Sequence, residues 1–332
     1  MPEDYSRSKR RNRPGKKGKG RLLKLSILTF LGLILLLGAG LTYMGYTLQQ
    51  VTSDNYHELN RGEQSELRDT GVSPSSDPVS ILFLGLDTRD GDLSGRTDAM
   101  ILASFNPEDQ SVQMLNIPRD SYVPIENHNH NKINHAHAYG GVDKTISTVE
   151  NFLDIPIDHV VSLNFDAFME IIDAVGGITV DVPMDIADTD NATYGTIEIS
   201  EGEQTLDGEE ALAYVRMRKD DPQGDLGRGE RQKDVLEALI HEVASFQTLT
   251  RFNSLVDALD GNLSTNLLFS QIMGMHGYAG ELNNIESLSL EGEDTRIDGV
   301  YFYQVYDSSR EEISEKFKQH LNITGESYAN EE

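Results

Sequence analysis

The feature that most restricts this chain is an apolar segment near its N-terminus. Residues 25–46, LSILTFLGLILLLGAGLTYMGY, number 22 and carry no charge. A helix rises about 1.5 Å per residue, so this segment can cross the roughly 30 Å hydrocarbon core of a bilayer. A cleavable signal peptide is the alternative, but its apolar region is only about 7–15 residues long and ends at a small-residue cleavage site. The segment therefore favours a retained transmembrane helix.

The charge before this segment predicts the orientation of the chain. Residues 1–24 carry ten basic and two acidic side chains. Basic flanks stay on the cytoplasmic side, so we expect a cytoplasmic N-terminus and an extracellular C-terminal bulk. The basic tail would also lie against anionic lipids of the inner leaflet, with nucleic acid as the alternative partner of the tail. These features predict a single-pass protein of the cell membrane.

The chain beyond residue 24 is strongly acidic. It holds 18 basic and 53 acidic residues, a net charge of −35. Such a surface repels nucleic acid, because binding requires neutralisation of phosphates, and we find no helix-turn-helix pattern. The sequence contains no cysteine, which excludes disulfides, zinc–thiolate sites and cysteine nucleophiles. We therefore expect an extracellular domain that relies on its apolar core and has no nucleic-acid partner.

Apolar runs that alternate with helical patterns predict the fold. The run VSILFLGLD at 79–87 is apolar almost throughout, which is typical of a strand buried on both faces. Further strands are predicted at 99–105, 112–117, 159–165, 178–183 and 299–306. Helices are predicted at 142–153, at 166–175 with Asp166 as its cap, and at about 229–246, with peripheral helices at about 251–260 and 268–281. The alternation predicts an α/β fold, layered α/β/α with a central mixed β-sheet flanked by helices.

Composition divides the chain into five parts. These are a basic tail at 1–24, a transmembrane helix at 25–46, a polar extracellular stalk at 47–77, a folded domain at 78–310 and a charged C-terminal tail at 311–332 that is helical at most in part. Within the domain, the acidic, turn-rich run 184–210 is predicted as a hairpin or insert. Every motif described below falls in residues 79–243.

Arginines gather where predicted strands end. Seven of the twelve arginines beyond the N-terminal tail lie in four short segments, GLDTRDGDLSGRTD, NIPRD, YVRMR and GRGERQ. In open α/β sheets, ligands bind beyond strand ends, and arginine forks match phosphate oxygens at any pH. For a single arginine, a salt bridge with one of the many carboxylates is the alternative. The set as a whole predicts one anion site.

The stretch 214–232, YVRMRKDDPQGDLGRGERQ, supplies most of these arginines. Residues 211–218 are predicted as a helical turn leading into a strand, on which Arg216 and Arg218 would point to one face. On the helix that follows, Arg228, Arg231 and Gln232 fall at i, i+3 and i+4, also one face. The two elements would thus direct four arginines at one point.

Two aspartates frame the first pair of predicted strands. Asp87 ends the first strand and Asp98 opens the second. Two carboxylates, with phosphate oxygens and water, are ligands that suit Mg²⁺. The alternative is structural, with Asp87 as a turn cap and Asp98 as an ordinary residue at a strand end.

Five segments occur in an order that resembles the LytR–CpsA–Psr (LCP) family. They are GLDTR…RTDAMIL, IPRDSYV, KINHAHAYGG, VGGITVDVP and L.G..AL.YVR.R…D.GR..RQ, and together they cover about half of the chain. Members of this family are cell-wall glycopolymer ligases of Gram-positive bacteria. The resemblance implies an LCP-type catalytic domain over 78–310. It also implies a phosphotransferase that moves a teichoic-acid or capsule-type polymer from an undecaprenyl-diphosphate carrier to peptidoglycan and releases polyprenyl phosphate.

The resemblance also implies roles for individual residues. Asp87 and Asp98 would hold Mg²⁺, with Mn²⁺ as a substitute ion. The diphosphate would be bound by Arg89, Arg119, Arg216, Arg218 and Arg228, with Gln232 beside them and Arg96 and Arg231 in support of that shell. Lys132 would contact phosphate or sugar. Arg119, Asp98 and Asp225 would be catalytic, and Asp225 could orient a side chain or accept a proton. An apolar groove between sheet and helices would take the polyprenyl tail.

The segment 127–141, NHNHNKINHAHAYGG, departs from the family pattern. It holds four histidines, His128, His130, His135 and His137, where the family usually has small or aromatic residues near the last two. His-x-His pairs can bind zinc or copper, although such polar residues also occur on loops that face glycans. The sequence favours no resident metal at this segment and leaves the alternative open.

Two other functions fit the same residues. A hydrolase would use water in place of the acceptor hydroxyl and release free glycan. A non-catalytic receptor or regulatory protein would bind the lipid diphosphate with the same arginines and show no turnover.

Overall fold

The structure, a computed structural model, describes residues 55–62, 64–88, 92–189, 195–217, 221, 224–243, 261–268, 270–272, 274–275 and 284–323. The chain divides into two units, Met1–Thr47 and Leu48–Glu332, and all described residues belong to the second. The predicted basic tail and transmembrane helix lie outside the described residues. Within the described ranges, no helix is both long enough and apolar enough to span a bilayer.

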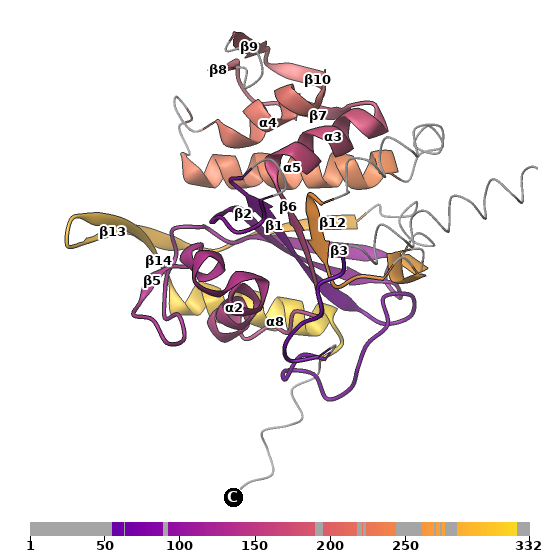
Figure 1. Ribbon diagram of the computed structural model, residues 1–332, viewed down its shortest axis with the longest axis vertical. Helices are drawn as coiled ribbons and strands as arrows, with labels where there is room; N and C mark the ends of the chain where they lie inside the picture. Colours follow the sequence, from indigo (N-terminus) through magenta and orange to yellow (C-terminus); the bar gives the residue numbers. More distant parts are fainter. Residues whose placement is uncertain are drawn as a thin grey trace, which may run out of the picture. The chain divides into compact units, whose positions relative to one another are not determined.

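A six-stranded mixed sheet forms the centre of the described unit (Figure 1). Its strands, in spatial order, are β11 (Leu263–Thr265), β6 (His159–Leu163), β1 (Val79–Leu86), β2 (Thr97–Asn106), β3 (Ser111–Asn116) and β12 (Asn284–Ser289). β1 is parallel to β6, and β3 is parallel to β12, whereas β2 is antiparallel to both of its neighbours. The prediction of a central mixed sheet is confirmed.

Helices cover both faces of this sheet. On one face lie α3 (Phe165–Val175), α4 (Gly208–Arg216) and α5 (Asp225–Val243), and on the other lie α2 (His135–Leu153) and α8 (Asp307–His320) (Figure 1). Leu82 and Leu84 of β1 pack in the core that contains α2 and α8, whereas Ile81 and Phe83 belong to the cluster that α5 joins. Because both faces are covered, β1 has to be apolar at nearly every position.

A second, smaller core lies against α3 and α4, away from the sheet. There β7 (Ile178–Val182) pairs with β10 (Gly202–Leu206), and β8 (Ile186–Thr189) forms a hairpin with β9 (Thr196–Ile199). Ile178, Leu206 and Tyr214 are buried in this cluster. The strand predicted at 178–183 therefore exists but does not extend the central sheet. The run 184–210 contains the predicted hairpin and, in addition, strand β10.

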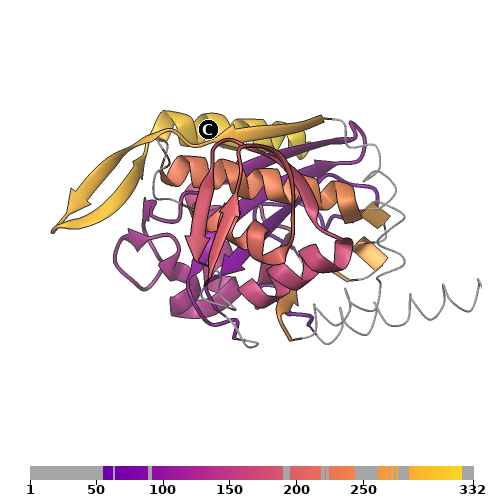
Figure 2. The ribbon, with the colours of Figure 1, turned by 90° about the horizontal axis from the view of Figure 1, so that it is seen from above.

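Two further hairpins gather near the start of α2. One joins β4 (Tyr122–Val123) to β5 (Asn131–Lys132), and the other joins β13 (Gly292–Ile297) to β14 (Val300–Val305). Figure 2 shows the second hairpin projecting from the side of the described unit. An isolated bridge between Ser121 and Tyr303 links the two.

Several predicted helix boundaries were wrong for local reasons. Asn164, not Asp166, caps α3, since its side chain accepts the Ala167 backbone N–H at 2.9 Å. α2 begins at His135 and is kinked at Gly140–Gly141, where Gly141 has φ 63°, so the predicted helix from 142 is only its second part. α5 begins at Asp225, before the predicted start at 229.

The folded unit extends past both predicted boundaries of the domain. Within the predicted stalk, the Arg68 guanidinium bonds the Asp158 carboxylate at 2.6 Å, with side chains only 7% and 3% exposed. Within the predicted charged tail, α8 buries Ile313 and Phe317 in the core under the sheet. Its charged residues occupy the outer face, which explains why composition alone indicated a solvated tail.

Candidate functional site

A cavity of about 290 Å³ lies between the central sheet and helices α3, α4 and α5. Its lining is mainly apolar and includes Phe83, Val161, Leu163, Phe168, Leu236 and Leu239. One part is polar and is formed by Asp98, Arg119, Arg216, Arg228 and Gln232. An apolar cavity with convergent cations suits an amphipathic ligand that has an anionic head.

A β-bulge places Asp98 in this polar part. Gly85 of β1 pairs with Ala99, but Leu86 pairs with Thr97, so Asp98 is the extra residue of β2. A bulge bends the strand and redirects side chains, and both Asp98 and Ala99 line the cavity. Asp98 accepts a hydrogen bond from the Arg119 guanidinium, and its side chain remains 32% exposed.

Arg119 is held by its surroundings at the end of β3. Its carbonyl accepts the Asn134 backbone N–H at 3.3 Å, and its Nε lies 3.8 Å from the Asp120 carboxylate. Asp120 is buried and also bonds Lys132 Nζ at 2.7 Å. Lys132 is therefore tied next to the site through Asp120 but does not line the cavity. The sequence analysis assigned no role to Asp120, although it directly follows Arg119 in the NIPRD segment.

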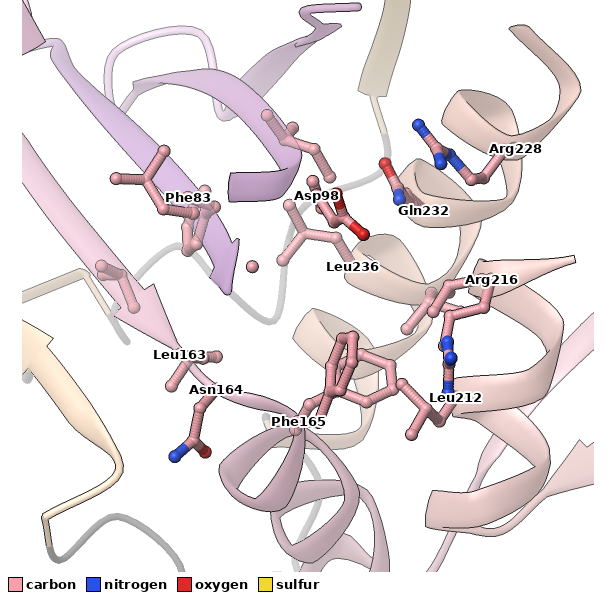
Figure 3. Close-up of a pocket in the computed structure, with 18 of the residues that line it drawn as sticks. Phe83, Asp98, Leu163, Asn164, Phe165, Leu212, Arg216, Arg228, Gln232 and Leu236 are labelled. Atoms are coloured by element: carbon pink, nitrogen blue, oxygen red, sulfur yellow. The ribbon is translucent and has the colours of Figure 1, made fainter. Parts of the chain in front are cut away.

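Helix α5 brings two of the predicted residues to the site because it approaches the sheet closely. A Cβ on Gly229 would lie 2.1 Å from Asn116 Nδ2, so a larger residue would require the Asn116 side chain to move. Arg228 and Gln232, four residues apart, share one face of the helix and line the cavity with only 7% and 9% exposure. Figure 3 shows both side chains on the same helix beside Asp98.

Arg231, which was predicted to take part in diphosphate binding, does not line the cavity. Its guanidinium bonds the Asp221 carboxylate at 2.6 Å, the Tyr214 carbonyl at 2.9 Å and the Met217 carbonyl. The Arg231 and Asp221 side chains are each 3% exposed. Arg231 therefore ties α5 to the segment that ends α4, and these bonds, not its position along the helix, keep its guanidinium from the cavity lining.

Arg216 reaches the site from a helix, so the strand predicted to carry it was wrong. Asp207 and Glu210 form a capping box at the start of α4, which continues to Arg216. A cation in the last turn is favourable because the helix C-terminus carries partial negative charge. The Arg216 guanidinium lies 5.1 Å from the centre of the Phe165 ring, and Figure 3 shows the two side by side at the cavity.

The remaining predicted site residues are placed as follows. Arg89 and Arg218 lie outside the described residues, and of Asp225 only the backbone, at the start of α5, is described. Arg96 is exposed, and its carbonyl accepts the Asp87 backbone N–H at 3.3 Å. The described structure thus brings together five predicted residues and leaves Asp87, Arg96, Arg231 and Lys132 outside the cavity lining.

The four histidines of segment 127–141 are not arranged around a common point. His137 is buried, and its Nδ1 lies 2.9 Å from the Gly95 carbonyl, so it holds the β1–β2 loop. Burial, together with the charges of Arg96 and Lys132, lowers the pKa of His135. Among the described residues, no group of three or more His, Cys, Asp or Glu side chains could hold a metal. The ring contacts of His128 and His130 are instead with tyrosines.

Asp87 and Asp98 still fit a Mg²⁺ ion that shares its coordination with substrate. Because Leu86 at the end of β1 pairs with Thr97 at the start of β2, the two aspartates occupy neighbouring positions at the same end of the central sheet. Asp87 is exposed and Asp98 partly so, which leaves carboxylate oxygens accessible. Mg²⁺ usually takes one or two carboxylates and completes its shell with phosphate oxygens and water. Hard oxygen donors next to an arginine-lined cavity meet that requirement.

The fold and the site define an α/β protein with a mainly apolar cavity that ends at a cluster of arginines with Asp98 and Gln232. The LytR_cpsA_psr family matches residues 42–319, well over half of the sequence, and the chain belongs to this family. It is 38% identical over 309 residues to the polyisoprenyl-teichoic acid–peptidoglycan teichoic acid transferase TagU of Bacillus subtilis (strain 168). The matched region covers 92% of this chain and 98% of that protein.

Solved structures of relatives match the same fold. "TagT bound to LI-WTA" superposes with a TM-score of 0.69 at 39% identity and covers 80% of this chain and 100% of that one. A second structure, TagT "with bound octaprenyl pyrophosphate lipid", has a TM-score of 0.65 at 36% identity and the same coverage of both chains. The mixed α/β architecture is therefore shared with these relatives.

Proposed function

We propose that this chain transfers a phosphate-linked glycopolymer of the teichoic-acid type from a polyprenyl-diphosphate carrier, undecaprenyl in the cell, to peptidoglycan. The oxygen of an acceptor hydroxyl attacks the phosphorus that bears the glycan. The bond from that phosphorus to the bridging oxygen breaks, and polyprenyl phosphate leaves with the bonding electrons. The hydroxyl proton passes to a general base, for which Asp225 is the candidate from the sequence.

The observation that carries this proposal is the cavity itself. An apolar volume of about 290 Å³ between sheet and helices ends at Asp98, Arg119, Arg216, Arg228 and Gln232. Such a cavity matches a prenyl chain attached to a diphosphate, and a related structure holds octaprenyl pyrophosphate. The names of the relatives supply the polymer class and the acceptor that we propose here.

The chain's own residues position and stabilise the reacting group. Arg119, Arg216 and Arg228 are placed to bind phosphate oxygens through forks of N–H donors. Arg119 is held by Asp98 and Arg216 lies against the Phe165 ring, so these cations would stabilise the negative charge that develops on the leaving phosphate with little reorganisation. Phosphoryl transfer depends mainly on such positioning and charge stabilisation, so no covalent intermediate on the protein is required.

Asp87 and Asp98 would hold Mg²⁺, or Mn²⁺ in its place. The ion would neutralise phosphate charge and orient the diphosphate. Asp98 also accepts from Arg119, so it orders the arginine that faces the cavity. We further propose that residues 25–46 anchor the protein in the cell membrane, with residues 1–24 in the cytoplasm and the catalytic domain outside.

A transfer assay with the full-length chain in detergent tests this function. The substrates are a polyprenyl-diphosphate-linked glycan and peptidoglycan, with Mg²⁺ present or chelated, and the products are polyprenyl phosphate and wall-bound glycan. Arg119→Ala and Asp98→Ala should each lower turnover by about 10²–10³-fold, the loss typical of removing a group that stabilises transition-state charge. The matched control is Arg310→Ala, an arginine of α8 that bonds the Phe152 carbonyl.

The products separate the competing functions. Glycan bound covalently to peptidoglycan supports the transferase, whereas free glycan with equal release of polyprenyl phosphate would indicate a hydrolase. Tight lipid-diphosphate binding without turnover would indicate a receptor. If both site variants kept wild-type turnover, the site assignment would be wrong.

A further inference from the structure

An aromatic surface outside the cavity has no role in the site described so far. We define the aromatic face as Tyr122, His128, His130, His135, Tyr139 and Phe302. These residues come from the β4–β5 hairpin, the first turns of α2 and strand β14. His128, His130 and Tyr139 are exposed, and Tyr139 is 41% exposed.

The rings of the aromatic face form two ordered groups. In the first, His128 stacks on Tyr139 with ring centres 4.1 Å apart and an interplanar angle of 9°, and His135 meets Tyr139 edge-on at 5.9 Å. In the second, the Tyr122 ring lies 5.2 Å from His130 and 4.9 Å from Phe302. Phe302 is buried at 7% exposure and packs against Tyr122, whereas His128, His130 and Tyr139 are exposed. Because aromatic rings are normally buried for their apolar area, these exposed rings with defined ring contacts indicate an interaction surface.

Polar groups accompany these rings at defined positions. The Tyr139 hydroxyl accepts from Asn131 Nδ2 at 2.8 Å and lies 3.4 Å from His135 Nδ1. Lys132 Nζ lies 5.6 Å from the centre of the Tyr301 ring and 5.7 Å from that of Phe302. The surface therefore combines apolar ring faces with hydrogen-bonding groups at their edges.

A short series of contacts connects the aromatic face to the anion site. Asp98 accepts from Arg119, Arg119 adjoins Asp120, and Asp120 bonds Lys132. Lys132 follows Asn131, the residue that bonds Tyr139. The aromatic face thus adjoins the anion site by way of β5 and α2, whereas the apolar cavity is lined by residues of the sheet and of α3, α4 and α5.

We propose that the aromatic face binds the glycan strand of the acceptor, an inference that rests on the proposed transfer to peptidoglycan. A pyranose ring has an apolar C–H face that packs on an aromatic ring such as that of Tyr139. Its hydroxyls, around the rim of the ring, form hydrogen bonds with the polar groups beside Tyr139. The acceptor hydroxyl has to approach the phosphorus from outside the cavity that holds the carrier's tail. The residues of the aromatic face lie outside the cavity lining and next to the anion site, through Arg119, Asp120 and Lys132.

A metal site at the same histidines fits the structure less well. His137 is buried with the Gly95 carbonyl as its partner, and His128 uses its ring face to stack on Tyr139. Within the described residues, no three potential metal-binding side chains converge. The ordered rings therefore favour a ligand that packs on ring faces over one that binds imidazole nitrogens.

Direct binding of a glycan tests this inference without the donor. The full-length chain in detergent is titrated calorimetrically with soluble β-1,4-linked N-acetylglucosamine–N-acetylmuramic acid strands freed of their peptides. Tyr139→Ala and His128→Ala should each weaken binding about tenfold, the loss expected when one stacking ring is removed. Tyr139→Phe keeps the ring and should stay within about twofold of wild type. Tyr306→Ala, an equally exposed tyrosine outside the face, is the matched control and should leave affinity unchanged.

The transfer assay separates this inference from the proposed function. In the Tyr139→Ala variant, KM for the acceptor should rise about tenfold, while the affinity for polyprenyl diphosphate and kcat at saturating acceptor stay unchanged. If wild-type chain binds no glycan, or if the alanine variants bind it as tightly as wild type, the inference is wrong even where transfer proceeds. If the Tyr139 variant loses glycan binding but the wild-type chain transfers no polymer, the proposed function is wrong. The aromatic face then remains a glycan-binding surface.

Discussion

The two faces of the central sheet are built from the same strands but are packed differently. On the face covered by α2 and α8, Leu82, Leu102 and Phe317 are fully buried. On the face covered by α3, α4 and α5, Phe83 and Leu236 stay partly exposed because they border the cavity. One face is therefore a filled core, whereas the other combines packed residues such as Ile81 and Met114 with an open cavity.

The difference shows that apolar content does not separate a core from a pocket. The side chains that β1 and β2 contribute to the two clusters are all apolar, with leucine and methionine on the α2–α8 face and valine, isoleucine, alanine and phenylalanine on the other. The covering helices decide the outcome. α8 inserts Phe317 into the core, whereas α5 contacts the sheet at Gly229 and leaves space beside Leu236 and Leu239.

The largest expected effect is on the filled face. Phe317→Ala should lower the free energy of unfolding by about 3–5 kcal/mol, because a fully buried ring leaves a void that the core cannot close. Phe168→Ala, which removes a ring that borders the existing cavity, should cost less than about 2 kcal/mol. Chemical denaturation of the full-length chain in detergent measures both. Equal losses would mean that the pocket wall is packed as tightly as the core.

The next comparison separates two arginines of one helix. Arg231→Met should cost about 3 kcal/mol of stability, since it leaves Asp221 buried without its partner. Arg228→Met should change stability far less but weaken diphosphate binding about tenfold, because Arg228 lines the cavity. Denaturation and calorimetric titration with a prenyl diphosphate measure the two effects. A reversal of this pattern would contradict the placement of Arg231.

A smaller effect is expected from filling the pocket. Leu239→Trp should weaken binding of a long-chain prenyl diphosphate about tenfold, because the larger side chain occupies space for the tail. Binding of inorganic diphosphate, which needs only the cations, should stay unchanged and serves as the control. An equal loss for both ligands would place the tail somewhere other than this cavity.

The smallest expected effect is on the pH dependence of stability and involves His320 on α8. His320 lies 2.8 Å from both the Ser104 and the Ser111 hydroxyls, and its burial lowers its pKa. In the unfolded chain His320 takes up a proton below about pH 6.5, whereas in the folded chain its lowered pKa delays protonation to a lower pH. Neutral His320 therefore contributes to the free energy of unfolding above about pH 6.5, and this contribution is lost as the pH falls through the pKa of the folded state. The slope is at most about 1.4 kcal/mol per pH unit for one proton.

His320→Gln should therefore flatten the dependence of unfolding free energy on pH between about 5 and 7. Burial also lowers the pKa of His159. The contribution of His159 to the pH dependence of the unfolding free energy should therefore remain in the variant. A variant with the full wild-type slope would show that His320 does not contribute.

Much of the fold could be predicted because it follows from local pattern. The run at 79–87 is apolar on both faces, and it forms β1 between two covered faces. Strands near 99–105, 112–117 and 159–165 were also predicted correctly, within a few residues at their ends. The arginines that line the cavity were identified from their residue type and their place near element ends, together with the family resemblance.

The sequence by itself determined the layered fold, the family and the kinds of residue at the site. Only the tertiary structure decided which of those residues converge. Arg228 and Arg231 are three positions apart, yet one lines the cavity and the other binds Asp221. The physical reason is that a side chain's direction depends on the bulge at Asp98, on α4 forming where a strand was predicted, and on contacts between distant segments, such as Gly229 with Asn116. None of these leaves a period or a spacing that can be read along the chain.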